Sequence, residues 1–264
     1  MADSPPRQPV VERRVTSAGG GMEDWGIAVE TPVEIGINGA PWTVMMATPT
    51  DLEDLAIGLA LTERVVTDIG AVERMTVSNY LEGIVVDLTV HAHAVSESAR
   101  NRRSLEGRIG CGLCGVEALA GLPSRPTGAV GKRISVTAVA VHRALVDLSA
   151  LQPLNLATHS VHAAAWCSAD GGIELVREDV GRHNALDKLI GARVRAGRIE
   201  APGFIAMTSR CSFELVYKAA ATRAGVLATI SAPTSLALEW AAMLDLPLMC
   251  RGAGDSIVAF APGG

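Results

Sequence analysis

The C-terminal half of the sequence alternates short apolar strands with helices, and this alternation limits the folds open to the chain. Residues 204–208 and 226–230 carry only apolar and small side chains, as strands buried on both faces do. Strands separated by helices usually pair in parallel, so the pattern predicts an α/β layer with a largely parallel sheet. The neighbouring elements are predicted as helices 182–195, 213–223 and 235–244 and a last strand, 247–250.

The N-terminal part is predicted to be a smaller, β-rich unit. Asn38-Gly39 favours a type I′ hairpin turn, because both positions of that turn need a positive φ. Thr50-Asp-Leu-Glu53 fits a capping box at the start of a helix whose apolar face carries Leu52, Leu55, Ala56, Leu59 and Val66. Strands are expected at 26–30, 33–37, 42–47, 72–78 and 84–90. A helix capped by Thr137 and running to about Leu151 is expected next, followed by a hairpin of 161–168 and 172–176.

We therefore expect an α/β fold, α+β overall, in four regions. Residues 1–22 are rich in Pro, Gly, Arg and Ser and predict a disordered tail. The others are an N-terminal α+β subdomain over 23–108, a cysteine loop and linker over 109–130, and an α/β domain over 131–264.

Composition narrows the class of protein. Aromatic residues make up 3% and the net charge is -5, which argues against a nucleic-acid-binding surface. No 18-residue apolar stretch and no apolar signal region are present, which predicts a cytoplasmic protein without a membrane span. Five cysteines in 264 residues do not resemble a disulfide framework.

The segment Gly110-Cys-Gly-Leu-Cys-Gly115 is the first candidate site. Glycines leave Cys111 and Cys114 accessible, and the predicted helix start after them favours the thiolate. Four interpretations stay open: a sulfur-carrying or nucleophilic thiol, half of a zinc site completed by His159 and His162, a thioredoxin-like redox pair, and inert structural thiols. We nonetheless expect no bound metal, because the sequence contains no second CxxC.

Two further motif readings are rejected. The same segment spells Gly-X-Gly-X-X-Gly, but no strand precedes it and no acidic residue follows at the spacing of a dinucleotide site. A zinc deaminase needs His-X-Glu and Pro-Cys-X-X-Cys, and neither occurs.

Three other segments are candidate anion sites. In Arg177–Lys188, a helix is predicted to begin with Arg182, His183 and Asn184, whose first turn suits an anion, although these residues can equally cap and solvate the helix. Ser209, Arg210 and Ser212 follow a buried strand, where ligands of α/β sheets gather. The third segment, Arg251–Asp255, follows the last parallel strand. These clusters converge on one sheet edge and suggest sulfur chemistry on a phosphate-bearing cofactor.

The sequence resembles the formate dehydrogenase accessory sulfurtransferase (FdhD) family from about Glu30 to Val258. The resemblance rests on Glu30-Thr-Pro-Val-Glu-Ile with Asn38-Gly39, Thr48-Pro49, Asp54-Leu-Ala, Glu63, the Cys-Gly-Leu-Cys-Gly segment, the long string from Arg177 to Lys188, Ser-Arg-Cys-Ser-Phe-Glu, and Ser231-Ala-Pro-Thr-Ser-Leu-Ala. It implies a cytidine-deaminase-like α/β/α fold for the C-terminal part, without deaminase activity.

The resemblance also implies a function. Family members take persulfide sulfur from a cysteine desulfurase onto the first cysteine of the pair, here Cys111, and pass it to the molybdenum or tungsten of bis-molybdopterin guanine dinucleotide for formate dehydrogenase. Cys114 is a second acceptor or a disulfide partner. The cofactor is expected near Arg251, Gly252, Ala253, Gly254, Asp255 and Ser256, with Ser209, Arg210 and His183 on the same edge. A homodimer is also implied.

This chain departs from the family pattern at three places. Thr158-His-Ser-Val-His162 replaces a glycine-containing string, Cys211 replaces a small residue, and Arg251 is displaced. The alternatives to a sulfurtransferase are a cofactor-holding chaperone that transfers no sulfur and a structural protein with zinc at the CxxC pair.

Overall fold

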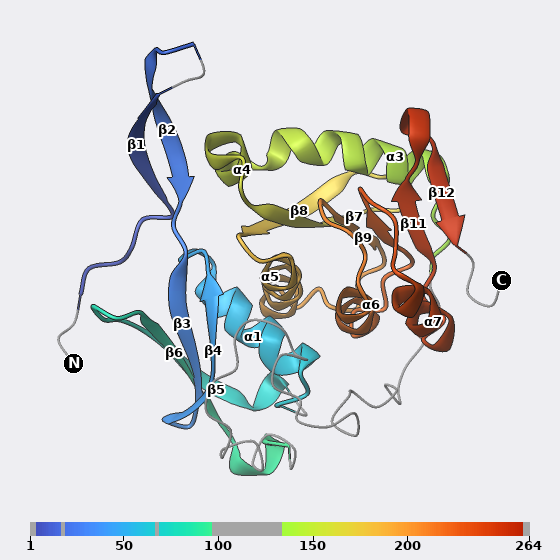
Figure 1. The fold of residues 1–264 in the computed structure, drawn as a ribbon. Helices are drawn as coiled ribbons and strands as arrows, with labels where there is room; N and C mark the ends of the chain where they lie inside the picture. Colours follow the sequence, from blue (N-terminus) through green and yellow to red (C-terminus); the bar gives the residue numbers. More distant parts are fainter. Residues whose placement is uncertain (1–3, 17–18, 67–68, 97–133, 261–264) are drawn as a thin grey trace.

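The computed structural model describes residues 4–16, 19–66, 69–96 and 134–260. Within these residues the chain forms two sheets, each covered by helices, and a two-stranded hairpin near the N-terminus (Figure 1). The segment predicted as the cysteine loop and linker, 109–130, lies outside the described residues, and so do Cys111 and Cys114.

The N-terminal sheet has four strands in the order β4-β3-β6-β5. These are β3 (Thr31–Ile37), β4 (Ala40–Ala47), β5 (Val72–Asn79) and β6 (Ile84–Val90). The β3–β4 turn has positive φ at Asn38 and Gly39, which confirms the predicted hairpin turn. Buried side chains of β3 and β6 alternate along each strand and pack against α1 (Leu52–Thr62), so this sheet has one buried face.

The C-terminal sheet has six strands in the order β12-β11-β10-β9-β7-β8. The middle strands β9 (Phe204–Met207), β10 (Leu227–Thr229) and β11 (Leu248–Arg251) are parallel. The outer strands β7 (His162–Cys167), β8 (Ile173–Asp179) and β12 (Ile257–Phe260) pair antiparallel. Their parallel pairing confirms the predicted parallel centre, and β9 and β10 are wholly buried, as the sequence also predicts.

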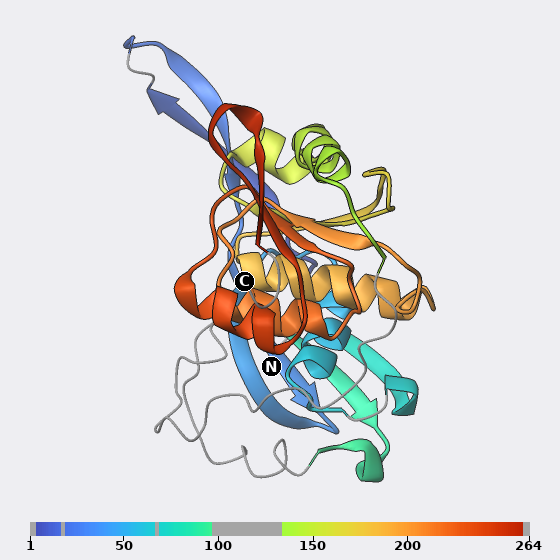
Figure 2. The ribbon, with the colours of Figure 1, turned by 90° about the vertical axis from the view of Figure 1, so that its right-hand side faces the viewer.

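Helices cover both faces of this sheet. On one side lies α3 (Ala138–Asp147), continued by a 3-10 turn (Leu148–Leu151) and α4 (Pro153–Thr158). On the other side lie α5 (Arg182–Arg195), α6 (Phe213–Ala220) and α7 (Ser235–Met243), as Figure 2 shows. Thr137 caps α3 by accepting from the Ala140 N–H at 3.2 Å, as the sequence predicts. The predicted α/β class and the three-layer α/β/α arrangement are confirmed.

Two local predictions are wrong. The N-cap of α1 is Asp51, in a left-handed conformation with φ 50°, and no side chain caps the helix. Thr50 therefore does not form the expected capping box, and the carboxylate of Asp51 instead approaches the guanidinium of Arg177 at 3.5 Å.

The second correction concerns the expected disordered tail over residues 1–22. Residues Val10–Thr16 form β1, which pairs antiparallel with β2 (Met22–Ala28). The preceding segment is also fixed, because Arg7 donates to the carbonyl of Leu81 at 2.7 Å and the Ser4 N–H donates to that of Asn79 at 2.8 Å. These partners are distant in sequence, so local composition does not reveal them.

The two sheets are joined by a close crossing of α1 and α5. An added Cβ at Gly58 would lie 1.8 Å from the Asp187 carbonyl oxygen, and one at Gly191 would lie 1.8 Å from that of Asp54. Neither helix therefore tolerates a side chain where they cross.

We predict that Gly58→Ala and Gly191→Ala each lower the free energy of unfolding by about 2 kcal/mol or more, because the helices must separate. Urea unfolding measures the change. Gly19→Ala is the matched control, since no atom lies within 4 Å of its Cβ position, and it should leave stability nearly unchanged. Equal stability of all three variants would contradict the close crossing.

Candidate functional site

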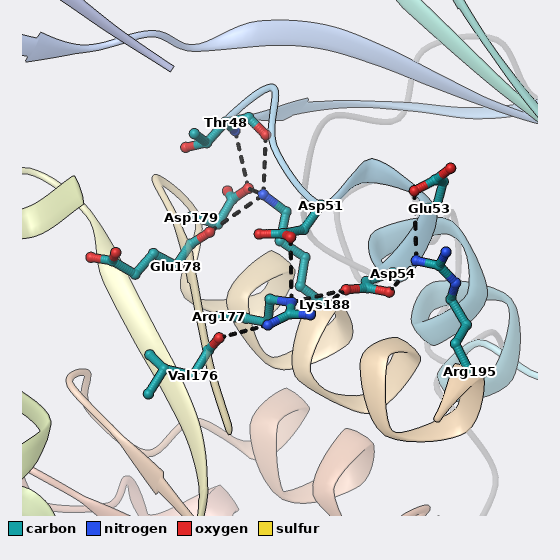
Figure 3. Close-up of polar contacts among 10 residues, drawn as sticks. All are labelled: Thr48, Asp51, Glu53, Asp54, Val176, Arg177, Glu178, Asp179, Lys188 and Arg195. Atoms are coloured by element: carbon teal, nitrogen blue, oxygen red, sulfur yellow. Dashed lines mark hydrogen bonds and ion pairs between the residues drawn. The ribbon is translucent and has the colours of Figure 1, made fainter. Parts of the chain in front are cut away.

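The segment Arg177–Lys188 connects the two halves of the molecule. Asp179 and Lys188 form an ion pair of 2.7 Å, and both side chains are 0% exposed. Figure 3 shows this pair and its neighbours. The same pair holds Thr48 after β4: its N–H donates to Asp179 at 3.0 Å, and its carbonyl accepts from Lys188 at 3.0 Å. A buried pair of opposite charges is stable only when such additional hydrogen bonds compensate its lost hydration.

A second part of the same connection lies along α1. The buried carboxylate of Asp54 forms ion pairs with the guanidinium groups of Arg177, at 2.8 Å, and Arg195, at 2.6 Å (Figure 3). Asn184 donates to the Met46 carbonyl at 2.8 Å and to Asp179 at 2.9 Å. Arg177 and Asn184 thus serve the junction between the two halves, and the N-terminal unit and the sheet edge are held together by charged side chains.

A third buried ion pair joins α5 and α6 to the end of α1. Lys218 contacts Asp187 at 2.9 Å and Glu63 at 3.0 Å, and the Thr62 hydroxyl donates to Asp187 at 2.8 Å. Burial alone would lower the pKa of Lys218, but the carboxylates of Asp187 and Glu63 outweigh it and the pKa is raised. Lys218 therefore stays charged at any physiological pH.

We define the junction as Thr48, Asp54, Thr62, Arg177, Asp179, Asn184, Asp187, Lys188, Arg195 and Lys218. The sequence predicted either an anion site or a solvated helix cap for the Arg177–Lys188 string, and the structure places five of its twelve residues in this junction. The partners Thr62 and Lys218 were missed. The signals for Thr48 and Asp54 were present, since both belong to the segments that carry the family resemblance.

His183 differs from the rest of that string, because it faces the start of α6. The His183 Nε2 atom lies 3.9 Å from a carboxylate oxygen of Glu214. Among the described residues at the starts of α5 and α6, the buried atoms Nε of Arg182, Nε2 of His183 and Oγ of Ser212 have no hydrogen-bond partner. Buried polar atoms are normally paired, so this group is suited to a polar ligand.

Burial lowers the pKa of His183 to about 4, and the positive charges of Arg182 and Lys218 act in the same direction. The imidazole is therefore neutral near pH 7, and it offers one donor and one acceptor.

Strand direction brings the predicted anion sites to one edge of the C-terminal sheet. The parallel strands β9, β10 and β11 end there, and β8, antiparallel to β7, ends at the same edge before α5. The segments after these strands begin at Val180, Thr208, Ile230 and Gly252. The convergence of the three clusters, which the sequence predicted, follows from this topology, and ligands of α/β sheets bind at such edges.

The individual residues lie differently along this edge. Ser209 is buried and its hydroxyl donates to the Arg210 carbonyl at 3.0 Å, while the Arg210 side chain is exposed. Arg251 forms an ion pair with Asp255 across the turn between β11 and β12.

In that turn the Ser256 hydroxyl donates to the Ala253 carbonyl at 2.8 Å, and Gly254 has a positive φ of 61°. The Gly252 N–H donates to the Ser256 carbonyl at 2.7 Å. The turn is thus a closed, exposed loop, and Arg251 must leave Asp255 to bind an anion.

The described cysteines are poor nucleophiles. Burial raises the pKa of the Cys167 and Cys211 thiols to about 12 and also raises that of Cys250. Because the thiolate is the reactive form, burial disfavours all three as nucleophiles at neutral pH. Over residues 4–16, 19–66, 69–96 and 134–260, no group of three or more His, Cys, Asp or Glu side chains is arranged to hold a metal ion.

Together, the α/β/α sheet with its polar edge and the attached β-rich unit define the class, a two-part α/β protein whose described cysteines are buried. The chain belongs to the FdhD/NarQ family, whose model matches residues 28–263.

Two relatives and one solved structure give the particular likeness. A sulfur carrier protein FdhD from Variovorax paradoxus is 46% identical over 241 residues, covering 90% of this chain and 84% of the relative. One from Xanthomonas campestris pv. campestris is 46% identical, covering 84% and 79%. A crystal structure from Desulfotalea psychrophila, described as a formate dehydrogenase accessory protein, has a TM-score of 0.67 at 20% identity and covers 96% of each chain, which shows the shared fold. None of the helices in the described parts has the length and apolar character that a membrane span requires.

We predict that acid destabilises the protein partly through His183. Its pKa is lowered in the folded state, so its contribution to stability is complete above the unfolded value near 6.5 and is lost as the pH falls toward 4. Between about pH 7.5 and about pH 5 this contribution falls by roughly 2 kcal/mol. Urea unfolding at the two pH values should show a smaller loss for His183→Gln than for the wild type. The exposed-histidine variant His93→Gln should keep the wild-type loss, and an undiminished loss in His183→Gln would contradict the assignment.

Proposed function

We propose that this protein is a sulfurtransferase that carries sulfur as a persulfide on Cys111 and delivers it to a metal-bound pterin dinucleotide. The observation that carries the proposal is membership of the FdhD/NarQ family, with relatives named sulfur carrier proteins over most of the chain. The chemistry of the thiols supports it. Burial raises the thiol pKa of Cys167, Cys211 and Cys250 and so disfavours them as nucleophiles. Cys111 and Cys114 remain as the candidate nucleophiles.

The loading step balances as a thiol exchange. The thiolate of Cys111 attacks the outer sulfur of a cysteine desulfurase persulfide, and the desulfurase cysteine leaves as a thiolate. Cys111 then holds one extra sulfur, and no external oxidant or reductant is needed.

Release as sulfide needs two electrons, and Cys114 supplies them by attacking the inner sulfur of Cys111. The products are a Cys111–Cys114 disulfide and one sulfide ion. In the alternative role, Cys114 accepts the outer sulfur and the persulfide moves by one thiol. A disulfide after release distinguishes the first role from the second.

The proposed substrate is bis-molybdopterin guanine dinucleotide, with molybdenum or tungsten, and the client is a formate dehydrogenase. The edge of the C-terminal sheet fits the phosphates and polar base edges of such a molecule, because it combines exposed Arg210 with the unpartnered buried atoms of Arg182, His183 and Ser212. A neutral His183 suits hydrogen bonding to an uncharged group rather than to a phosphate.

We predict that incubation with a cysteine desulfurase and cysteine adds one sulfur atom to the protein, and that peptide mapping places it on Cys111. Cys111→Ser should abolish the gain and the activation of formate dehydrogenase. Cys211→Ala is the matched control and should keep both, since that thiol is buried. No gain in the wild type, with cofactor binding retained, would replace the proposal by a chaperone that holds the cofactor. Bound zinc that persists after dialysis, lost in Cys111→Ser, would favour the structural alternative.

We also predict that guanosine diphosphate, used as a probe, binds at the sheet edge. Arg210→Ala should weaken binding about tenfold or more, since a charge-assisted hydrogen bond contributes about 1.5–3 kcal/mol. Arg143→Ala is the control, because Arg143 pairs with Asp170 in the turn between β7 and β8, at the opposite end of the sheet. Equal binding by both variants in calorimetry would remove this edge from the proposal.

A further inference from the structure

The turn between β11 and β12 contains an ion pair that occupies one cation of the candidate edge. Arg251, the last residue of β11, donates from Nε and Nη2 to one carboxylate oxygen of Asp255, and the Nε contact is 2.8 Å. Figure 1 shows this turn at the end of β11 that lies away from α7. Arg251 lies beside the ends of β9 and β10, because these strands run parallel to β11. A carboxylate therefore covers part of a guanidinium at the edge where a phosphate-bearing ligand is proposed to bind.

The backbone of this turn is held without the ion pair. The Gly252 N–H donates to the Ser256 carbonyl at 2.7 Å, and the Ser256 hydroxyl donates to the Ala253 carbonyl at 2.8 Å. An added Cβ at Gly252 would lie 2.7 Å from the Ser256 Oγ, so the chain is closely packed here. The carboxylate of Asp255 can therefore leave Arg251 while the turn keeps its shape.

Asp255 has a backbone conformation that few side chains tolerate. Its φ is 62°, and the φ of Gly254 before it is 61°. Among residues other than glycine, aspartate and asparagine adopt such values most readily, because their short polar side chains can bond locally. Asparagine at this position should thus keep the backbone while it removes the charge.

Arginine binds carboxylates and phosphates with the same donors. A phosphate that approaches Nε and Nη2 of Arg251 must displace Asp255, and a phosphate that approaches Nη1 lies beside a carboxylate of like charge. Both routes lower the affinity for an anion. The side chains of Arg251 and Asp255 are 41% and 61% exposed, so the pair can open and an external anion can reach the guanidinium.

We propose that Asp255 is an internal competitor for an anion site at Arg251. This assignment rests on the proposed function, since a phosphate-bearing ligand is what the carboxylate competes with. Displacing an ion pair this exposed lowers the affinity of each phosphate by about two- to fivefold. Small phosphates that contact little else are then held too weakly to occupy the edge. A large dinucleotide that also contacts Arg210 and the starts of α5 and α6 stays bound.

Calorimetry of the full chain with inorganic diphosphate as the probe tests this competition, at low ionic strength because salt screens exposed charges. Asp255→Asn should bind diphosphate about two- to fivefold more tightly than the wild type. Asp245→Asn is the matched control, because Asp245 is also exposed, has a φ of 52° and precedes β11 at the other end of the strand. It removes the same charge and should bind diphosphate as the wild type does.

A second pair of variants locates the effect. In an Arg251→Ala background, Asp255→Asn should no longer tighten binding, because the cation that the carboxylate occupies is gone. The circular dichroism spectrum and the thermal midpoint should stay near the wild-type values in every variant, since the hydrogen bonds of Gly252 and Ser256 remain.

Four results would overturn the proposal: no diphosphate binding by either the wild type or Asp255→Asn, equal binding by the two, the same gain in Asp245→Asn or in the Arg251→Ala background, and weaker binding by Asp255→Asn. The last result would make Asp255 itself a ligand contact. Sulfur loading has a separate readout in the mass of the protein. A protein that loads Cys111 can therefore fail this test, and a protein that loads no sulfur can pass it.

Discussion

The buried ion pair of Asp179 and Lys188 is the interaction on which the arrangement of the molecule depends. It lies where β8 ends and α5 begins, and it fixes Thr48, the residue that follows β4. Two charges removed from water stabilise a fold only when their geometry is complete, and here both backbone groups of Thr48 complete it. Removing one partner from such a pair costs about 3–5 kcal/mol, because an uncompensated charge stays buried.

This pair has consequences for the candidate site. The junction fixes the N-terminal unit against α5, and α5 begins at the edge where β9, β10 and β11 end. The orientation of Arg182 and His183 is therefore set by the residues around them in the same string, which are held by Thr48, Asp54 and Lys218. A string of twelve residues thus has two roles: five of its residues join the two halves, and two others, Arg182 and His183, lie at the start of α5 at the candidate edge.

The sequence predicted much of the fold for a clear physical reason. Strands β9 and β10 are buried on both faces, and their apolar composition shows this directly. The start of α5 at Arg182 was predicted correctly because the apolar positions of the helix repeat with its period. The prediction of a capping box was wrong because Thr50 fits the local pattern, whereas the N-cap of the helix is the next residue, Asp51. The prediction of a disordered tail was wrong because β1 pairs with β2, and because Ser4 and Arg7 before it bond to the carbonyls of Asn79 and Leu81, which composition does not encode.

The sequence also predicted that the candidate residues lie on one edge of the sheet. Strand direction is enough to bring Arg210, His183 and Arg251 to one edge, and the topology confirmed that they share it. The junction was not predicted, because Asp179 and Thr48 are 131 residues apart and Lys218 and Thr62 are 156 residues apart. No local pattern specifies which buried charge meets which carbonyl over such distances.

The most direct test of this account is hydrogen exchange of Lys188→Met, read separately in β3 of the N-terminal sheet and β9 of the C-terminal sheet. If the ion pair joins the two halves, wild-type β3 and β9 exchange with the same free energy of opening, and in the variant β3 becomes less protected than β9. Equal protection of the two strands in Lys188→Met, at the wild-type level, would contradict the central role of the Asp179–Lys188 pair.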